Sequence, residues 1–261
     1  FFVSMVWLLH KVLKRKEVQL YFLGLMPIII VSFSILANDQ ELKIQTHITG
    51  DPNKPIIFMI HGSPGSSNDF SKFVNDTELR SKALLITIDR PGFGLSEIPT
   101  NPPNIEEQAQ MFSEYLNDQY PNKTVLLMGH SYGATIAAKM AAAKNSKFKS
   151  VFLLSIMADP LELKKSPRFK IVQFMSGSAM LKVVQFLIPQ SFISAQRELE
   201  GLGKDLENLL NDWKNISSKV TLVHGDHDRV VTPFNSLFAK TNISKNNIDI
   251  DTFAKKLLGQ I

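Results

Sequence analysis

The segment around Ser131 constrains the fold of this chain more than any other feature. A short apolar run at residues 125–128 leads directly into a G-x-S-x-G motif at residues 129–133, and an alanine-rich stretch continues to Lys144. A serine in this setting is typical of a very tight turn between a strand and a helix, in which bulky side chains two positions to either side would clash. The segment therefore predicts a buried strand, a sharp turn at Ser131 and a helix.

The position of Ser131 also has a chemical consequence. A strand-to-helix turn of this kind pushes the serine oxygen out above the sheet. The helix that follows directs its N-terminal dipole and its free N–H groups toward the same point. We therefore interpret Ser131 as a nucleophile rather than as a residue that only caps the turn.

The rest of the chain alternates between strand-like and helix-like segments. Apolar and polar residues alternate at 41–49, which indicates an edge strand, and short apolar runs recur along the chain, as expected of strands covered on both faces. The predicted strands are residues 41–49, 56–60, 83–88, 125–128, 151–154, 220–223 and 248–253, and the predicted helices are residues 104–119, 131–144 and 233–240. The last helix has Thr232 as its expected cap and Pro233 at its first position. This order predicts an α/β fold, in which a mostly parallel central sheet is flanked by helices.

One long interval interrupts the alternation. Residues 157–216 separate two predicted strands by far more than a crossover helix needs. Apolar residues at helical spacing in this interval predict a helical cap that sits over the sheet as a lid. The alternative is a set of extra helices on the side of the domain. The predicted core therefore comprises residues 38–156 and 217–261, and the predicted cap comprises residues 157–216.

The first 37 residues differ from the rest of the chain. A basic cluster between Lys11 and Lys16 precedes an uncharged apolar stretch at residues 18–37. This pattern is typical of an export signal, and the stretch is also long enough to cross a bilayer. Residues 1–37 are therefore predicted to be a signal peptide or a membrane anchor, with a buried N-terminal helix as the alternative. The remaining chain would be exported, periplasmic or secreted, or held at a membrane through residues 18–37.

Charge and cysteine content exclude several classes of function. The chain has a net charge of +5, but residues 1–37 hold four basic residues and one acidic residue, which leaves only +2 for the remainder. A nearly neutral domain does not favour nucleic-acid binding. The absence of cysteine excludes disulfides, thiolate chemistry and cysteine-ligated zinc. Nothing in the sequence implies a metal or an organic cofactor.

Two loops that follow predicted strands agree with a site at Ser131. Residues 61–66 form a glycine-rich loop, and the backbone N–H of Ser63 together with that of Tyr132 would supply the two donors that stabilise an oxyanion. We expect His61 to hold this loop in place rather than to transfer protons. Residues 89–96 are expected to form a structural turn beside the site.

An acidic residue is expected just past the end of the strand at residues 220–223. A carboxylate in that position can orient a catalytic histidine. Asp226 and Asp228 both lie there. We favour Asp228, because Asp226 follows the turn glycine Gly225 directly and could serve only to cap the turn.

These motifs, in this order, resemble those of the α/β-hydrolase fold family. The resemblance covers roughly residues 41–258 and rests on the segments 61–66, 89–96, 129–134 and 224–231. It implies a Ser–Asp–His triad in that chain order, with Ser131 and Asp228 as the first two members. It also implies an oxyanion hole at Ser63 and Tyr132. The implied reaction is hydrolysis of a small-molecule carboxylic ester, or a related acyl bond, through an acyl-enzyme.

The third member of the implied triad is missing from the sequence. The family places its histidine in a loop after the last strand. The histidines of this chain are His10, His47, His61, His130, His224 and His227, and none follows Asp228. Gly259-Gln260 stands where a Gly–His pair is expected. Glutamine cannot act as a base near neutral pH, because its amide does not bind a proton there.

Three explanations for the missing histidine stay open. The chain is a truncated or frame-shifted copy of an active enzyme, or it is a catalytically inactive binding protein that has kept the ligand pocket. In the third explanation His227, beside Asp228, acts as a substitute base. Loss of one triad member typically costs about 10⁴- to 10⁶-fold in rate, so the explanations differ in the activity that they predict.

Overall fold

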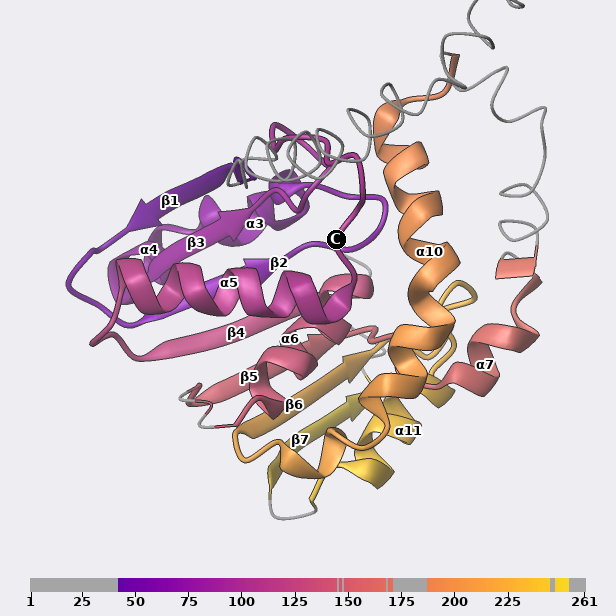
Figure 1. Ribbon diagram of the computed structural model, residues 1–261. Helices are drawn as coiled ribbons and strands as arrows, with labels where there is room; N and C mark the ends of the chain where they lie inside the picture. The colour runs from indigo at the N-terminus through magenta and orange to yellow at the C-terminus, as the bar shows by residue number, and fades with distance from the viewer. Residues whose placement is uncertain are drawn as a thin grey trace, which may run out of the picture. The chain divides into compact units, whose positions relative to one another are not determined.

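The computed structural model describes residues 42–144, 146, 148–167, 169–170, 187–244 and 247–253. These residues form a seven-stranded sheet with helices packed on both of its faces (Figure 1). The strands are β1 (Thr46–Gly50), β2 (Ile56–Ile60), β3 (Leu84–Ile88), β4 (Val125–His130), β5 (Ser150–Leu154), β6 (Lys219–His224) and β7 (Ile248–Phe253). The predicted α/β class is confirmed.

The sheet is parallel except at one edge. The strand order is β1-β3-β2-β4-β5-β6-β7, and β1 pairs with β3 in the antiparallel sense, whereas every other neighbouring pair is parallel. The expected edge strand at residues 41–49 is thus β1, although it begins later, at Thr46. Because the parallel strands end at the same side of the sheet, the loops that follow β2, β4, β5 and β6 come together there.

Alternate residues of the central strands pack into different layers. Phe58 of β2 belongs to the main core, together with Phe112 of helix α5 (Ile105–Gln119) and Ala137 of helix α6 (Tyr132–Ala142). Met59, the next residue of β2, packs instead with Phe70 on the opposite face. That face is covered by the short helices η1 (Ser67–Phe70), α3 (Ser71–Val74) and α4 (Thr77–Lys82). Burial on both faces explains why these strands have no polar alternation.

Helix α11 (Phe234–Asn242) starts one residue later than the sequence predicts. Pro233 is the cap residue of this helix and not its first helical residue. The hydroxyl of Thr232 does not cap the helix and donates instead to Glu162 Oε2 at 3.0 Å. A tertiary hydrogen bond to the neighbouring segment has therefore replaced the local capping bond that the sequence suggests.

The interval at residues 157–216 contains helices α7 (Pro160–Lys165) and α10 (Gln190–Leu209) and the short helix η3 (Trp213–Asn215). Both longer helices lie beside the carboxyl ends of the parallel strands in Figure 1. Leu202, Leu206 and Leu209 of α10 are buried in the main core. Residues 168 and 171–186 of the interval lie outside the described residues, so the extent of the cap stays a prediction.

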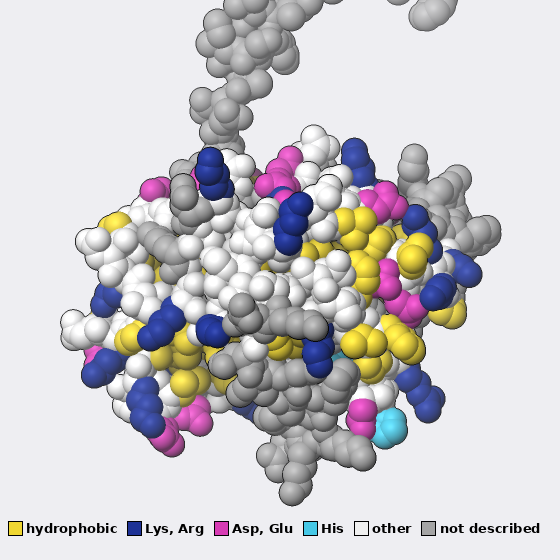
Figure 2. All heavy atoms as spheres, turned by 90° about the horizontal axis from the view of Figure 1, so that it is seen from below, with side chains coloured by type: hydrophobic (Ala, Val, Ile, Leu, Met, Phe, Trp, Pro, Cys, Tyr) yellow, Lys and Arg dark blue, Asp and Glu magenta, His cyan; other side chains and the backbone are white. Residues whose placement is uncertain are grey.

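Residues 1–41 also lie outside the described residues, and the signal peptide or membrane anchor at residues 1–37 stays a prediction. Within the described part of the chain, no helix has both the length and the apolar character that crossing a bilayer requires. The face drawn in Figure 2 carries apolar, basic and acidic side chains interspersed with one another. That face therefore presents no surface of a single charge sign.

Candidate active site

Ser131 occupies the turn between β4 and α6, as the sequence predicts. Its backbone angles are φ 54° and ψ −119°, in a region that side-chain-bearing residues rarely adopt. Its N–H donates to the carbonyl oxygen of Leu154 at 2.8 Å, which ties the turn to the end of β5. A strained serine held by the neighbouring strand matches the geometry expected of an exposed nucleophile.

The two glycines of the motif have no space for a side chain. A Cβ atom on Gly129 would lie 2.4 Å from the carbonyl oxygen of Gly133. A Cβ atom on Gly133 would lie 2.2 Å from the carbonyl oxygen of Ile60 and 2.4 Å from that of His61. These contacts are all with backbone atoms, which cannot rotate away. Glycine at position 129 therefore lets α6 begin this close to β4, and glycine at position 133 lets α6 approach the end of β2.

Ser131 lies at a cavity of about 490 Å³. The residues that line the cavity come mainly from α7, the segment directly after α7, α10 and the loop after β6, and they include the apolar side chains of Leu163, Phe169, Leu199 and Leu206. The cavity therefore places an apolar compartment next to the serine, which suits an uncharged organic group.

Ser63 and Tyr132, the residues from which the sequence predicts an oxyanion hole, both lie close to Ser131. Ser63 lines the same cavity as Ser131, and a Cβ atom on Gly62 would lie 3.1 Å from Ser131 Cβ. Tyr132 is the first residue of α6, where N–H groups have no partner within the helix. Within the described ranges, neither N–H donates to another residue. Both donors are thus free to bind a ligand oxygen.

His61 is fully buried and anchors the loop that carries Ser63. Its Nε2 accepts a hydrogen bond from the backbone N–H of Arg90 at 2.9 Å, so its Nδ1 carries the proton and donates to Gly62 O at 2.7 Å. Burial and the nearby charge of Arg90 lower the pKa of His61 from 6.5 to about 3. The ring is neutral near pH 7 and holds the loop, in agreement with the structural role expected for it.

The buried ring of His61 predicts a loss of stability in mild acid. Because the pKa of His61 is 6.5 when exposed and about 3 in the fold, the unfolded chain binds the proton more readily below pH 6.5. His61 should therefore lower the free energy of unfolding by about 2 kcal/mol between pH 7 and pH 5. Urea unfolding at both pH values measures this loss, which His61→Gln should remove and the exposed control His227→Gln should not. Equal pH dependence in wild type and His61→Gln would contradict the assignment.

The segment at residues 89–96 is a structural turn, as expected. The carboxylate of Asp89 accepts hydrogen bonds from the N–H of Ser67 at 2.7 Å and that of Leu95 at 2.9 Å. A Cβ atom on Gly94, whose φ is +53°, would lie 2.2 Å from Asp89 Oδ2. Asp89 therefore joins this turn to the first residue of η1, just after the loop at residues 61–66, and is not free for chemistry.

Asp228 lies on a fixed turn at the carboxyl end of β6. Its Oδ1 accepts hydrogen bonds from the N–H of Val230 at 2.8 Å and that of Val231 at 3.0 Å. Asp226 is exposed on the surface. The turn therefore holds Asp228 in one orientation, which is what a residue that orients a histidine requires.

His224 supports this same turn, a role that was not predicted from the sequence. The ring is buried at the end of β6, its Nε2 donates to Val231 O at 2.8 Å, and its Nδ1 accepts from Ser236 Oγ at 2.6 Å. Its Nε2 lies 3.7 Å from Asp228 Oδ2. His224 thus holds the turn that contains Asp228 through its hydrogen bond to Val231 O.

The described residues bring no histidine to the cavity. His227, the substitute base of the third explanation, is exposed and does not line the cavity with Ser131. Gln260 lies outside the described residues. Within the described ranges, no three His, Asp or Glu side chains are arranged to hold a metal ion. The described part of the site therefore contains a serine, two free N–H donors and an oriented carboxylate.

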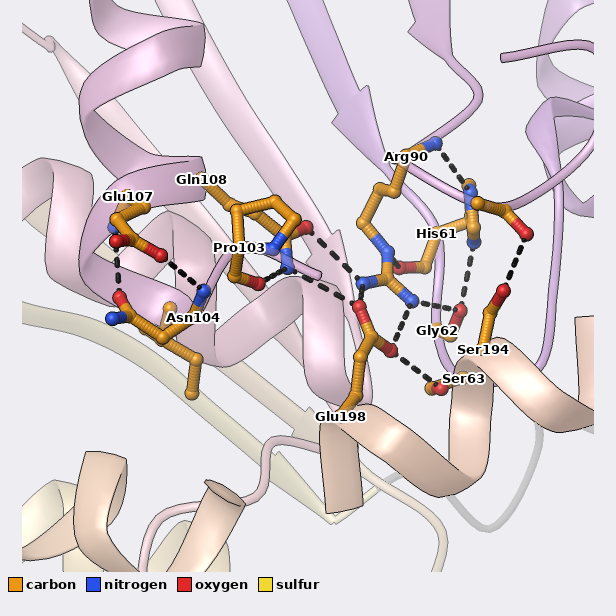
Figure 3. Close-up of polar contacts among 12 residues, drawn as sticks. His61, Gly62, Ser63, Arg90, Pro103, Asn104, Glu107, Gln108, Ser194 and Glu198 are labelled. Carbon is orange, nitrogen blue, oxygen red and sulfur yellow. Dashed lines mark hydrogen bonds and ion pairs between the residues drawn. The ribbon is translucent and has the colours of Figure 1, made fainter. Parts of the chain in front are cut away.

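A buried ion pair beside the site was not predicted from the sequence. Glu198 of α10 pairs with Arg90, and both side chains are almost completely buried (Figure 3). Glu198 falls on the apolar stripe of α10, four positions before Leu202. A carboxylate on the buried stripe of a helix needs a hydrogen-bond or charged partner. This feature of the sequence could have indicated that Glu198 is paired.

Comparisons with known proteins agree with this geometry. Residues 55–201 match the family model for the alpha/beta hydrolase fold. A lipase-esterase related protein from Clostridium acetobutylicum has 16% identity, with 82% of this chain and 91% of that chain covered and a TM-score of 0.63. The enol-lactonase from Burkholderia xenovorans LB400 has 14% identity, with 81% and 88% covered and a TM-score of 0.59. An N-acyl homoserine lactone degrading enzyme has 18% identity, with 83% and 91% covered and a TM-score of 0.63. At these identities the solved structures show the shared fold.

Proposed function

This chain belongs to the α/β-hydrolase fold family, and from that premise we propose that it is a serine hydrolase that cleaves a carboxylic ester, or a related acyl bond, through an acyl-enzyme. One observation carries the proposal. Ser131 lies in a strained turn on the wall of an apolar cavity, beside two N–H groups that have no partner in the described part of the chain. Acyl transfer needs this combination of nucleophile and oxyanion donors.

The reaction proceeds in two steps. Ser131 Oγ attacks the carbonyl carbon, and the N–H groups of Ser63 and Tyr132 bind the negative oxygen that develops. The tetrahedral intermediate then collapses, the alcohol leaves with a proton, and the acyl group stays on Ser131. Water subsequently attacks the acyl-enzyme and releases the acid. In this proposal Asp228 orients the histidine that carries the protons, and the fixed orientation of its carboxylate supports that role. The histidine is the member that the described residues do not supply.

The cavity favours an apolar acyl or alcohol group. Most of its exposed lining is apolar, and the residues that line it include Leu163, Phe169, Leu199 and Leu206, whose side chains offer no hydrogen bonds to a polar chain. Burying an aliphatic chain against such walls contributes about 25 cal/mol per Å² of apolar surface. We therefore expect short aliphatic esters to bind better than esters with charged acyl groups.

A second candidate function is ligand binding without turnover. The observation that favours it is the absence of a histidine from the cavity among the described residues. A protein of this kind would bind an apolar ester and leave it intact. The two functions differ in whether a covalent acyl group forms on Ser131.

Acylation of Ser131 distinguishes these functions. The full chain is incubated with p-nitrophenyl butyrate, and release of p-nitrophenolate is followed together with mass spectrometry of the peptide that contains Ser131. We expect one butyryl group on Ser131 and slow subsequent turnover, because deacylation must activate water while acylation has a good leaving group. Ser131→Ala should remove both signals.

Ser155→Ala is the matched control for this experiment. Ser155 has a similar left-handed backbone, with φ 46°, and its N–H donates to Val223 O at 2.8 Å, but it does not line the cavity. Its replacement should therefore leave acylation intact. Binding of the ester with no acyl group on Ser131 would favour the binding protein over the hydrolase.

A further inference from the structure

The guanidinium of Arg90 holds two consecutive carbonyl groups of the loop that carries Ser63. Its Nε donates to His61 O at 3.0 Å, and its Nη2 donates to Gly62 O at 2.8 Å. The side chain of Arg90 is fully buried. A charge in this position is tolerated only with a counter-charge close by.

Glu198 supplies that counter-charge from α10, and all of its acceptor positions are used. Its Oε1 accepts hydrogen bonds from Arg90 Nη1 and from Gln108 Nε2, the latter at 3.2 Å. Its Oε2 accepts from Arg90 Nη2 at 3.1 Å and from Ser63 Oγ at 2.7 Å. Figure 3 shows the carboxylate of Glu198 reaching from α10 to a point between Arg90 and Ser63. Glu198 is thus hydrogen-bonded both to Arg90 and to Ser63, the residue of the loop that supplies the N–H donor.

Because the peptide bond is planar, the hydrogen bonds to Gly62 O also fix the direction of the Ser63 N–H. The carbonyl of Gly62 and the N–H of Ser63 belong to one peptide unit, which is trans, so the two groups point in opposite directions. Arg90 Nη2 and His61 Nδ1 both donate to Gly62 O. Fixing the oxygen on one side of this unit fixes the direction of the N–H on the other side.

We infer that Glu198 is a positioning residue for the oxyanion hole. It holds Arg90 against the Gly62 carbonyl and holds Ser63 through its hydroxyl, and so it directs the Ser63 N–H toward the reacting carbonyl oxygen. Docking of α10 and completion of the oxyanion hole are therefore one event. The inference rests on the proposed serine hydrolase function, because Ser63 has a chemical role only there.

Glu198→Gln tests this role with little change in shape. A glutamine oxygen can still accept one hydrogen bond, but the charge that holds Arg90 is lost. A displaced oxyanion donor should lower kcat toward p-nitrophenyl butyrate by about 10²-fold, with KM changed less than about 2-fold. The matched control is Glu200→Gln, an exposed carboxylate on the same helix, which should leave both constants unchanged. An unchanged kcat for folded Glu198→Gln would overturn the inference.

A second variant separates the role of Glu198 in the oxyanion hole from its contribution to folding. Breaking one half of a buried ion pair destabilises a protein, whereas replacing both partners by apolar residues is often neutral. The double variant Arg90→Met with Glu198→Leu should therefore stay folded by circular dichroism. We expect kcat to fall in this variant as in Glu198→Gln, because Arg90 no longer donates to Gly62 O and α10 no longer holds the hydroxyl of Ser63. A folded double variant with the wild-type kcat would mean that the ion pair serves stability alone.

Binding of butylboronic acid keeps the test independent of a catalytic base. Butylboronic acid bonds to Ser131 Oγ as the hydroxyl proton is released to water. The tetrahedral anionic adduct then places an oxygen in the oxyanion hole without an acylation or deacylation step. Boron NMR titration of the full chain should give a dissociation constant that Glu198→Gln raises about 10-fold or more. An equal constant in both proteins would contradict the role of Glu198. Adduct formation that does not depend on Ser131 would instead contradict the proposed function.

Discussion

Gly133→Ala is expected to unfold the chain or to lower its free energy of unfolding by about 4 kcal/mol or more. The new methyl carbon would lie 2.2 Å from Ile60 O and 2.4 Å from His61 O. Both oxygens belong to the end of β2, a strand held between β3 and β4. Helix α6 would have to move away from the sheet, and the turn at Ser131 would move with it. Urea unfolding followed by circular dichroism measures the effect.

Gly201→Ala is the matched control for this stability experiment. Gly201 lies within α10, and a Cβ atom there would meet no atom within 4 Å. Alanine at an unhindered helical position stabilises a protein by about 0.5–1 kcal/mol relative to glycine. The same substitution should thus have opposite signs at the two positions. If Gly133→Ala retained wild-type stability, α6 could not lie as close to β2 as the structure places it.

The central strands could be predicted closely because their burial is continuous. Residues 56–60 were expected with the bounds that β2 has, and the strand expected at residues 83–88 begins only one residue before β3. The start of β1 was misplaced, because an edge strand has one solvent-facing side and its polar alternation continues into the preceding loop. The start of α11 was misplaced by one residue, because Thr232 bonds to Glu162 and not to the helix.

The outline of the site also followed from the sequence, because parallel strands bring their following loops to one side of the sheet. Ser63, Ser131 and Asp228 each lie within four residues of the end of such a strand. The Arg90–Glu198 pair could not be predicted in this way. Its members are 108 residues apart, and their contact depends on how α10 docks on the sheet. The helical pattern shows Glu198 as a carboxylate among apolar positions, but it does not indicate which residue Glu198 contacts.

Gln260→His is expected to raise kcat/KM toward p-nitrophenyl butyrate by about 10³-fold. The resemblance to the hydrolase family places a histidine at this point, 32 residues after Asp228. An imidazole, with an ordinary pKa near 6.5, can take the proton of Ser131 and later activate water, whereas an amide can do neither. The gain should increase with pH through the pKa of the new imidazole, because only its neutral form is a base. Initial rates between pH 5 and pH 9 measure both the gain and its pH dependence.

Coupling to the other members of the site distinguishes a restored triad from an adventitious imidazole. In the Gln260→His background, Ser131→Ala should remove the whole gain, and Asp228→Asn should remove most of it, because triad members act as a unit. Gln260→Asn, which changes the side chain but supplies no base, should give no gain. A gain that survives Asp228→Asn would contradict Asp228 as the orienting acid. Wild-type turnover that disappears in His227→Ala would instead assign the base to His227. In that case Gln260→His should add little, because the site would already have a proton acceptor for the same step.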